Sequence, residues 1–530
     1  MALAGAYQNL VAPPTGGVPS TDSGNYVLEV DWDNDGVYAT SSGENISNLT
    51  REVLYSRGRD FASQLTGRAI AGKLEATLLN VDGRFNSFAT AGPLYGNILP
   101  GRPVRLRAVA PTTYTLWAGF LDVVEPLPVH GGLNTARLTA LGPLGRIAGR
   151  NVSVAGATGV PTGTAVGTIL DNAGWATSTN RRSIDSGQSV MNRWWVDFQE
   201  ALPALRELEE TEAGYLGESP DGKIVYEDRH HRLQAPHTVS QAVYTDAATG
   251  ALRYDHISEA DPLALVFNVF ESRVRTFEAG TIDVLWTLAE SGSESPAIAP
   301  GETRTFWAEY PNPESPSNGA LVHAWTTPDP VTDYTAAQAP DGSGTDLTAS
   351  LSITATHYAR TMSIEITNGH ATLTAYVTFL QARGVPVVEG ATTRVVQEST
   401  NSQNKYGRRS YANAAPWIPN TAEAESWGAY GLNTYAEAAP VLTLGVLGNR
   451  SSDQLVEVQT RDISDRITVA ATSSDSGLGI NGDFFVEAVR GRIDHTAVHR
   501  VEYDLSPTSQ AGQFWILDVS ALDVDTILAY

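Results

Sequence analysis

The predicted fold of this chain depends most on three stretches near its end: DISDRI at Asp462–Ile467, GDFFVE at Gly482–Glu487 and FWILD at Phe514–Asp518. In each run apolar residues alternate with polar ones over a short length, which is typical of a strand with one buried face. The runs follow one another up to the terminal Tyr530. We therefore expect an antiparallel β unit at the end of the chain.

Composition indicates a folded chain of several domains. Its 530 residues exceed one ordinary core, and 42% of them are hydrophobic. The net charge of −24 disfavours binding to nucleic acid or an anionic membrane. Absence of cysteine excludes disulfides and thiolate metal sites. No apolar run is long enough to span a bilayer, and the first residues lack the basic region of a signal peptide, so we expect synthesis and folding in a cytoplasm.

The first part of the chain predicts an arm followed by short strands. Residues 1–24 are rich in turn residues without periodicity. From Tyr26 the pattern has period two, and Asp31–Tyr38 contains an Asn-Asp-Gly sequence typical of a hairpin turn. Further alternating runs begin at Lys73, Pro103, Leu116 and Thr135. Closely spaced strands and turns over residues 25–150 predict an antiparallel barrel or sandwich.

The middle of the chain predicts a small α+β unit over residues 151–237. A helix is expected near Ala165–Trp175, stopped by Gly174, and a second over Ala201–Glu212 with Pro203 in its first turn. The sequence Pro220-Asp221-Gly222 predicts a hairpin turn.

Strands are predicted again over 238–291, including Ala264–Phe270 and Thr281–Trp286. Residues 292–390 predict an inserted β-sandwich in which Met362–Thr367 pairs with Ala375–Leu380 across an Asn-Gly turn. A helix over Thr421–Tyr435, capped by Asn420 or Thr421, precedes the last strands within residues 391–530.

The order of several short motifs resembles the central hub, or minor tail protein, of long-tailed bacteriophages. The resemblance spans Tyr26 to Tyr530, and it is carried by VDWDNDG (30–36), RGRD (57–60), NVDGRF (80–85), YGNILPGRPV (95–104), RRSID (181–185), Trp194-Trp195, DGKIVYEDR (221–229), YGRR (406–409), DISDRI (462–467) and WIL (515–517).

The resemblance implies a mainly β protein with two tail-tube-like antiparallel β-barrels, one from residues 25–150 and one from strands near 240–290 and 440–530, beside the α+β unit and the inserted β-sandwich. Three copies would then form a homotrimeric ring of near-sixfold symmetry at the tail tip. The implied partners are the distal tail protein or tail tube, the tape-measure protein, receptor-binding or tip fibre proteins, and the host cell surface. Phage DNA would pass through the lumen without specific binding, and the expected role is structural, without enzymatic activity or cofactor.

The strongest metal candidate is the run Asp31, Asp33, Asp35 and Gly36, which copies the opening of an EF-hand calcium loop. The twelfth position holds Ser42 where a bidentate Glu is required, and the flanks predict strands. A hairpin turn is therefore favoured over a calcium site. His230, His231 and His237 are likewise better explained as the end of a strand, because adjacent strand residues point to opposite faces.

A rival interpretation is a secreted or virion protein that binds or cleaves glycans. Trp307, Tyr310 and Trp325 are candidates for stacking on sugars. Acidic pairs such as Glu207 with Glu210 offer a glycosidase arrangement, but sequence does not fix the separation that this chemistry needs.

Four arginines are candidates for assembly contacts. Arg57, Arg59, Arg408 and Arg409 are predicted in loops beside strands, where a guanidinium is suited to bidentate pairing with carboxylates of a neighbouring subunit. Ordinary surface ion pairs are the alternative.

Overall fold

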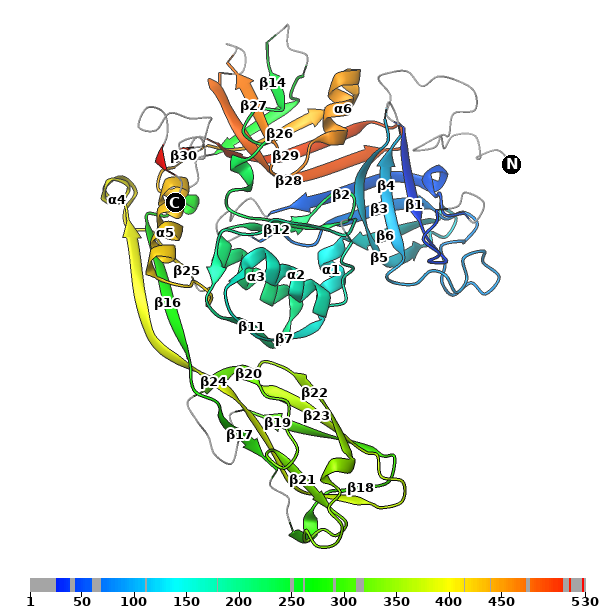
Figure 1. The fold of residues 1–530 in the computed structure, drawn as a ribbon. Helices are drawn as coiled ribbons and strands as arrows, with labels where there is room; N and C mark the ends of the chain where they lie inside the picture. Colours follow the sequence, from blue (N-terminus) through cyan, green and yellow to red (C-terminus); the bar gives the residue numbers. More distant parts are fainter. Residues whose placement is uncertain are drawn as a thin grey trace.

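The computed structural model describes residues 25–38, 43–59, 68–109, 112–178, 180–247, 252–260, 263–288, 292–310, 319–413, 415–438, 440–472, 477–508, 514–515 and 527–528. The predicted arm at 1–24 lies outside these residues. The described chain is mainly β, with a large upper body and a separate lower lobe (Figure 1). Within it, no helix has both the length and the apolar character needed to cross a membrane.

Six strands form the first half of a large sheet, in the order β1-β4-β5-β6-β3-β2. Their apolar residues alternate as the sequence predicts, so that one face of each strand is buried. The bounds are β1 Tyr26–Val30, β2 Thr50–Gly58, β3 Lys73–Leu79, β4 Pro103–Ala108, β5 Tyr114–Leu127 and β6 Thr135–Leu141. We call these strands the first unit.

Six further strands form the second unit, in the order β14-β27-β28-β29-β26-β15. As expected, the stretch DISDRI leads into β27, and the stretch GDFFVE lies within β28. The bounds are β14 Ala242–Thr245, β15 His256–Ala260, β26 Val441–Leu447, β27 Arg466–Ala471, β28 Ile480–Asp494 and β29 His499–Pro507.

The two units repeat one topology. Numbered along the chain within its own unit, each set of strands has the spatial order 1-4-5-6-3-2. Four of the five neighbour pairs are antiparallel in both units, and the exception is β14, which is parallel to β27 whereas β1 is antiparallel to β4. The chain therefore contains a structural duplication that its sequence does not reveal.

The units join into one twelve-stranded sheet because β2 pairs antiparallel with β28. Their apolar faces share one continuous core. Among the described residues no sheet closes into a barrel through strand pairing, so the expected barrels are seen as open sheets. His499 of β29, in the second unit, lies between β1 and β2, the two edge strands of the first unit. Its ring nitrogens are 3.0 Å from the Tyr26 hydroxyl and 2.8 Å from the Tyr55 hydroxyl.

The α+β unit lies against the middle of the sheet and has its own core (Figure 1). Helix α3 covers Ala201–Glu212 as predicted, and β12 and β13 form the predicted hairpin. The remaining elements are α1 Pro143–Ile147, β7 Asn151–Ala157, β8 Val160–Pro161, α2 Thr162–Asn172, β9 Arg182–Ile184, β10 Val190–Met191, β11 Trp194–Glu200, β12 Tyr215–Glu218 and β13 Ile224–Glu227.

A long two-stranded ribbon connects the body to the lower lobe (Figure 1). It consists of β16 (Val269–Ala279) and the second half of β24 (Ala375–Glu398). The prediction that strands up to residue 291 belong to the second unit is wrong for β16 and for β17 (Asp283–Thr287), because both pair with β24. Short apolar runs fit either sheet, and sequence does not tell which partner they find.

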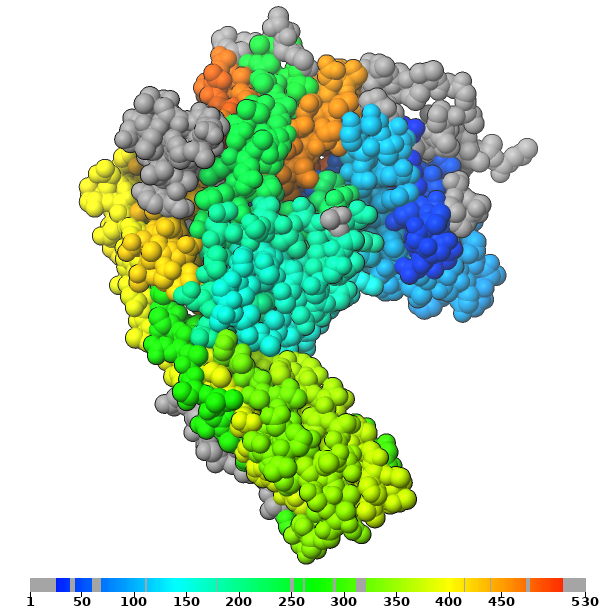
Figure 2. Space-filling model, in the orientation of Figure 1, coloured from blue at the N-terminus to red at the C-terminus, as the bar shows by residue number. Residues whose placement is uncertain are grey.

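The lower lobe contains two sheets around one core. Strand β24 pairs with β17, β18 (Ala297–Ile298), β20 (Gly319–Trp325) and β21 (Tyr334–Ala337). In the other sheet, β23 (Thr361–Asn368) lies between β19 (Thr303–Glu309) and β22 (Leu351–His357). The predicted pairing of Met362–Thr367 with Ala375–Leu380 is therefore wrong, since the chain crosses from one sheet to the other at this turn. Figure 2 shows this lobe projecting below the body.

The remaining helices and short strands complete the body. Helix α5 covers Thr421–Tyr435 as predicted, and the Asn420 side chain accepts a hydrogen bond from the Glu423 N–H. The other elements are α4 Thr400–Tyr406, β25 Ser410–Asn413, α6 Ser452–Thr460, β30 Phe514–Trp515, β31 Ile527–Leu528 and the 3₁₀ turns Ser47–Leu49, His231–Leu233, Leu263–Leu265, Gly292–Glu294, Thr348–Ser350 and Gly448–Arg450.

Candidate functional site

The place where the two units meet the α+β unit contains a cluster of buried charged side chains, which we call the junction. It is built from strands β2, β12 and β28, together with the segment after β13 and the loop before β27. Arg57 belongs to β2 rather than to a loop, and its Nη1 lies 2.6 Å from Asp462 Oδ1. The Arg57 side chain is only 4% exposed. Its carboxylate partner therefore comes from the second unit of the same chain.

Arg59 extends the junction toward the α+β unit. Its Nη2 donates to the Gly214 carbonyl oxygen at 2.9 Å, and its guanidinium lies over the Tyr215 ring. The backbone N–H of Arg59 donates to the Glu487 carbonyl oxygen at 3.0 Å, which continues the ladder between β2 and β28. Both arginines from the RGRD motif thus hold parts of one chain together.

Sequence reasoning missed a second ion pair of the junction, between Arg232 and Glu487. Arg232 donates to both carboxylate oxygens of Glu487, at 2.6 and 3.0 Å, and Ser506 donates to the same carboxylate at 2.6 Å. Burial by itself would raise the pKa of Glu487, but the charge of Arg232 and its hydrogen bonds lower it to about 2. The available signal was an acidic residue directly after the apolar run Phe484-Phe485-Val486.

Glu218 of β12 ties the α+β unit to the first unit. Its carboxylate accepts hydrogen bonds from the Gly72 N–H at 2.7 Å and the Leu144 N–H at 2.6 Å. Burial raises the pKa of this carboxyl group to about 7, although the two backbone donors oppose the shift. A carboxylate that accepts two backbone bonds inside a core acts as a positioning group for the strands around it.

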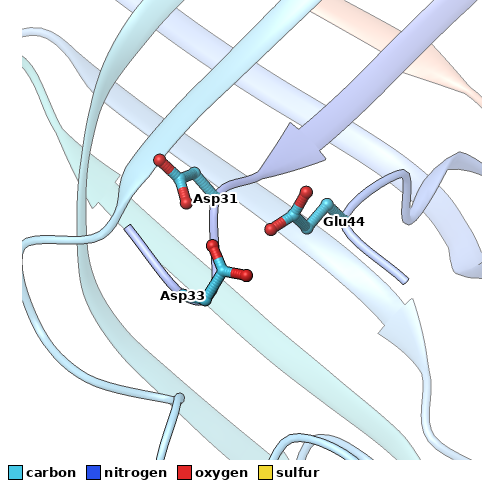
Figure 3. A group of neighbouring side chains, drawn as sticks. All are labelled: Asp31, Asp33 and Glu44. Carbon is cyan, nitrogen blue, oxygen red and sulfur yellow. The ribbon is translucent and has the colours of Figure 1, made fainter. Parts of the chain in front are cut away.

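The predicted calcium residues are only partly brought together. Figure 3 shows Asp31, Asp33 and Glu44 facing one another, and one carboxylate oxygen of each lies within 4.8 Å of the others. Asp35 is not in this group, and its carboxylate accepts from the Val37 N–H at 2.7 Å.

Within residues 31–38 the chain forms a loop without the second hairpin strand that we predicted. Asp31 fixes this loop, since its two oxygens accept from the Asp35 and Gly36 N–H groups at 3.1 and 3.0 Å. Calcium needs six to eight oxygen ligands. The group presents three carboxylates, and two of them, Asp31 and Asp33, already accept hydrogen bonds from the backbone.

Arg408 and Arg409 lie just before β25, far along the chain from the junction. Arg408 is exposed and pairs with Glu398 at 3.2 Å on the ribbon. Arg409 donates from Nε to the Val266 carbonyl oxygen at 2.9 Å, and its N–H donates to Asn268 Oδ1 at 2.8 Å. Arg409 is therefore used within the chain, whereas Arg408 is exposed at a surface.

The three aromatic candidates have different environments. Tyr310 and Trp325 are buried in the core of the lower lobe, but Trp307 is 55% exposed. The Trp307 ring stacks on Tyr358, with centroids 6.0 Å apart. Tyr358 in turn contacts the exposed Phe198 of β11. Sequence reasoning missed Phe198 and Tyr358, which lie far from Trp307 in the chain.

An ion pair accompanies these rings where the lower lobe meets the α+β unit. Arg360 Nε lies 2.8 Å from Asp197 Oδ2. Arg193, directly before β11, donates to the carbonyl oxygen of Phe277 on the ribbon strand β16 at 3.1 Å. The lower lobe is thus attached to the body by side chains as well as by the ribbon.

Comparison with known proteins finds similarity only among solved structures. No protein-family model and no curated protein matches the sequence. The tail protein from Neisseria meningitidis MC58 is similar with a TM-score of 0.48 and 8% identity, over 92% of this chain and 98% of that chain. The 43 kDa tail protein of prophage MuSo2 from Shewanella oneidensis has a TM-score of 0.45 and 10% identity, over 92% and 99%. Prophage tail protein gp18 from Listeria monocytogenes EGD-e has a TM-score of 0.37 and 7% identity, over 92% and 98%.

Proposed function

We propose that this chain is a structural virion protein that forms the trimeric hub of a phage tail tip. The observation that carries the proposal is the duplicated unit, because one chain contains two six-stranded sheets of the same order joined side by side through β2 and β28. Several short sequence motifs resemble those of tail hub proteins, and the ion pair of Arg57 with Asp462 joins the two units.

Duplication provides a way to match different symmetries. Three copies with two units each present six similar units in a ring, which suits a hexameric tail tube on one side and a threefold tip on the other. In this role the chain contacts the distal tail protein or tail tube and the tape-measure protein above, and tip fibre or receptor-binding proteins below. It assembles in the bacterial cytoplasm and becomes part of the virion.

The acidic composition fits a channel for DNA. A net charge of −24 repels the phosphate backbone, so DNA would pass through the lumen without being held. The role is structural rather than catalytic. Glu207, one of the carboxylates considered for glycoside hydrolysis, is already hydrogen-bonded to Gln199 and Trp417 at 3.0 Å each.

The test is the mass and shape of the purified full-length chain. Mass photometry should show a species of about 170 kDa, three times the 56.6 kDa chain, and negative-stain images should show rings. Addition of the tail tube protein should increase the trimer fraction. A strict monomer at every concentration, with and without the tube protein, would contradict the trimeric hub.

A second candidate function, glycan binding, is favoured by one observation, the exposed Trp307 stacked on Tyr358. Exposed aromatic rings supply flat apolar faces on which sugars stack. Titration with bacterial surface polysaccharide should change the fluorescence of the wild type but not of Trp307→Ala. Trp325→Phe, a change in the buried core of the same lobe, is the matched control.

A further inference from the structure

The join between β2 and β28 is a template for a contact between copies. Arg57 faces Val489, Tyr55 faces Gly491 and Val53 faces Ile493. The hydrogen bond from the Arg59 N–H to the Glu487 carbonyl oxygen places these odd-numbered residues of β2 in the hydrogen-bonded pairs of the antiparallel ladder. Leu54 and Arg492, which face each other between them, form a non-hydrogen-bonded pair.

The duplicated topology identifies the matching positions in the first unit. Strand β28 has a bulge between Val486 and Ala488 where it pairs with β29, and β5 has one between Leu121 and Val123 where it pairs with β6. Aligning the bulges places Val124 at the position of Val489, Pro126 at that of Gly491 and Leu127 at that of Arg492. The alignment extends to neighbouring strands.

The flanking strands agree with this alignment residue by residue. Leu74 of β3 pairs with Ala140 of β6, as Leu442 of β26 pairs with Leu505 of β29, and all four side chains are fully buried. By the same correspondence β15 matches β2, with Ser258 at the position of Leu54.

Both matching edges lack a strand partner within the described residues. Strand β4 pairs with β5 only up to Phe120, so the edge of Asp122–Leu127 that faces away from β6 is unpaired there. Val123 and Leu127 on this segment are each 39% exposed. Strand β15 pairs only with β26 and ends the sheet.

We propose that a second copy of this chain lays its β15 antiparallel along Glu125–Val129, which comprises the end of β5 and the two residues after it, with Ser258 opposite Leu127. The proposal rests on the proposed hub and names its contact between copies. Each copy then contributes its β15 to one neighbour and accepts the β15 of the other neighbour at the end of its β5. Such a heterologous contact closes into a ring of three when successive copies are rotated by one third of a turn. Every contact between neighbouring units in the ring, within a copy or between copies, then has the same strand register.

The two kinds of contact differ in strength because of proline. Pro126 and Pro128 occupy the positions of Gly491 and Ile493, whose backbone groups face β2. Proline has no N–H to donate, so the ladder between copies lacks two of the hydrogen bonds that the ladder within the chain has. The contact between copies is therefore the weaker one.

The absence of cysteine from the chain makes a direct test possible. In the full-length double variant Ser258→Cys/Leu127→Cys, mild oxidation should link copies into covalent dimers and trimers and no larger species. Facing residues of a non-hydrogen-bonded pair lie at a distance that a disulfide bridges. Leu54→Cys/Arg492→Cys is the matched control, and it should give a disulfide within one monomer.

The outcomes separate this contact from the hub function. Trimers in mass photometry with no intermolecular disulfide would overturn the contact and leave the hub intact, whereas a strict monomer without disulfides would overturn both. Pro126→Val/Pro128→Val gives an independent measurement, since the restored donors should tighten self-association by about tenfold or more. Unchanged self-association of a variant with a wild-type melting temperature would overturn the assigned role of the prolines.

Discussion

Removal of the Glu487 charge should weaken the junction more than any single surface change. Arg232 holds the pKa of Glu487 at about 2, against an ordinary value of 4.5. A difference of about 2.5 pH units at about 1.36 kcal/mol each corresponds to roughly 3 kcal/mol. The side chain is 3% exposed, so solvent screens little of this energy. Glu487→Gln should therefore destabilise the protein by about 3 kcal/mol at pH 7.

Urea unfolding followed by tryptophan fluorescence measures this change. Arg232→Met should have a similar cost because it leaves the Glu487 carboxylate buried without its main partner. The double variant should cost clearly less than the sum of the two single variants, since neither charge is then left alone. Glu271→Gln, which breaks an exposed pair with Arg394 on the ribbon, is the control and should leave the unfolding midpoint unchanged.

The same pair predicts a pH dependence with a definite sign. The pKa of Glu487 is lowered in the folded state, so its contribution is present above pH 4.5 and is lost as the pH falls toward 2. Glu487→Gln should remove this part of the acid destabilisation. A cost below about 1 kcal/mol at pH 7, or an unchanged acid slope in the variant, would refute the reasoning.

Three further predictions concern other sites. Asn420→Ala removes the cap of α5 and should cost about 1 kcal/mol in thermal unfolding, whereas an unchanged melting temperature would mean that the cap is dispensable. Burial lowers the pKa of His499 to about 3, so stability should fall as the pH drops below 6.5, and His499→Asn should show a smaller loss between pH 7 and pH 5. Calcium should leave the melting temperature unchanged, because the oxygens of Asp31 already accept backbone hydrogen bonds; a rise of several degrees that Asp33→Asn abolishes would contradict this.

Sequence reasoning was accurate where the signals are local. Helices α3 and α5 were predicted with their observed bounds, because proline in the first turn, an Asn cap and apolar spacing act within a few residues. The hairpin of β12 and β13 follows in the same way from the sequence Pro220-Asp221-Gly222. Each of these features is specified by a short segment without help from distant parts of the chain.

Long-range pairing was the part that sequence did not determine. The 24-residue strand β24 pairs with five other strands and draws β16 and β17 away from the second unit. Arg57 was predicted in a loop for a neighbouring subunit, but its partner Asp462 lies 405 residues along the same chain. An arginine that suits a carboxylate gives no indication of which carboxylate it meets, so the chemistry was predictable and the partner was not.

The difference between the two kinds of contact has a consequence for the order of assembly. Within one chain, β28 accepts β2 through a full ladder that is supported by Glu52 with Arg492 at 2.7 Å and by Arg57 with Asp462 at 2.6 Å. A contact of equal strength between copies would let newly made chains associate through β15 before the tail tube is available. Proline at the receiving edge weakens this association, while neighbours on a tube bring copies close together and raise their effective concentration. Under the proposed contact, the subunit therefore folds first and the ring closes where the tail tube gathers the copies.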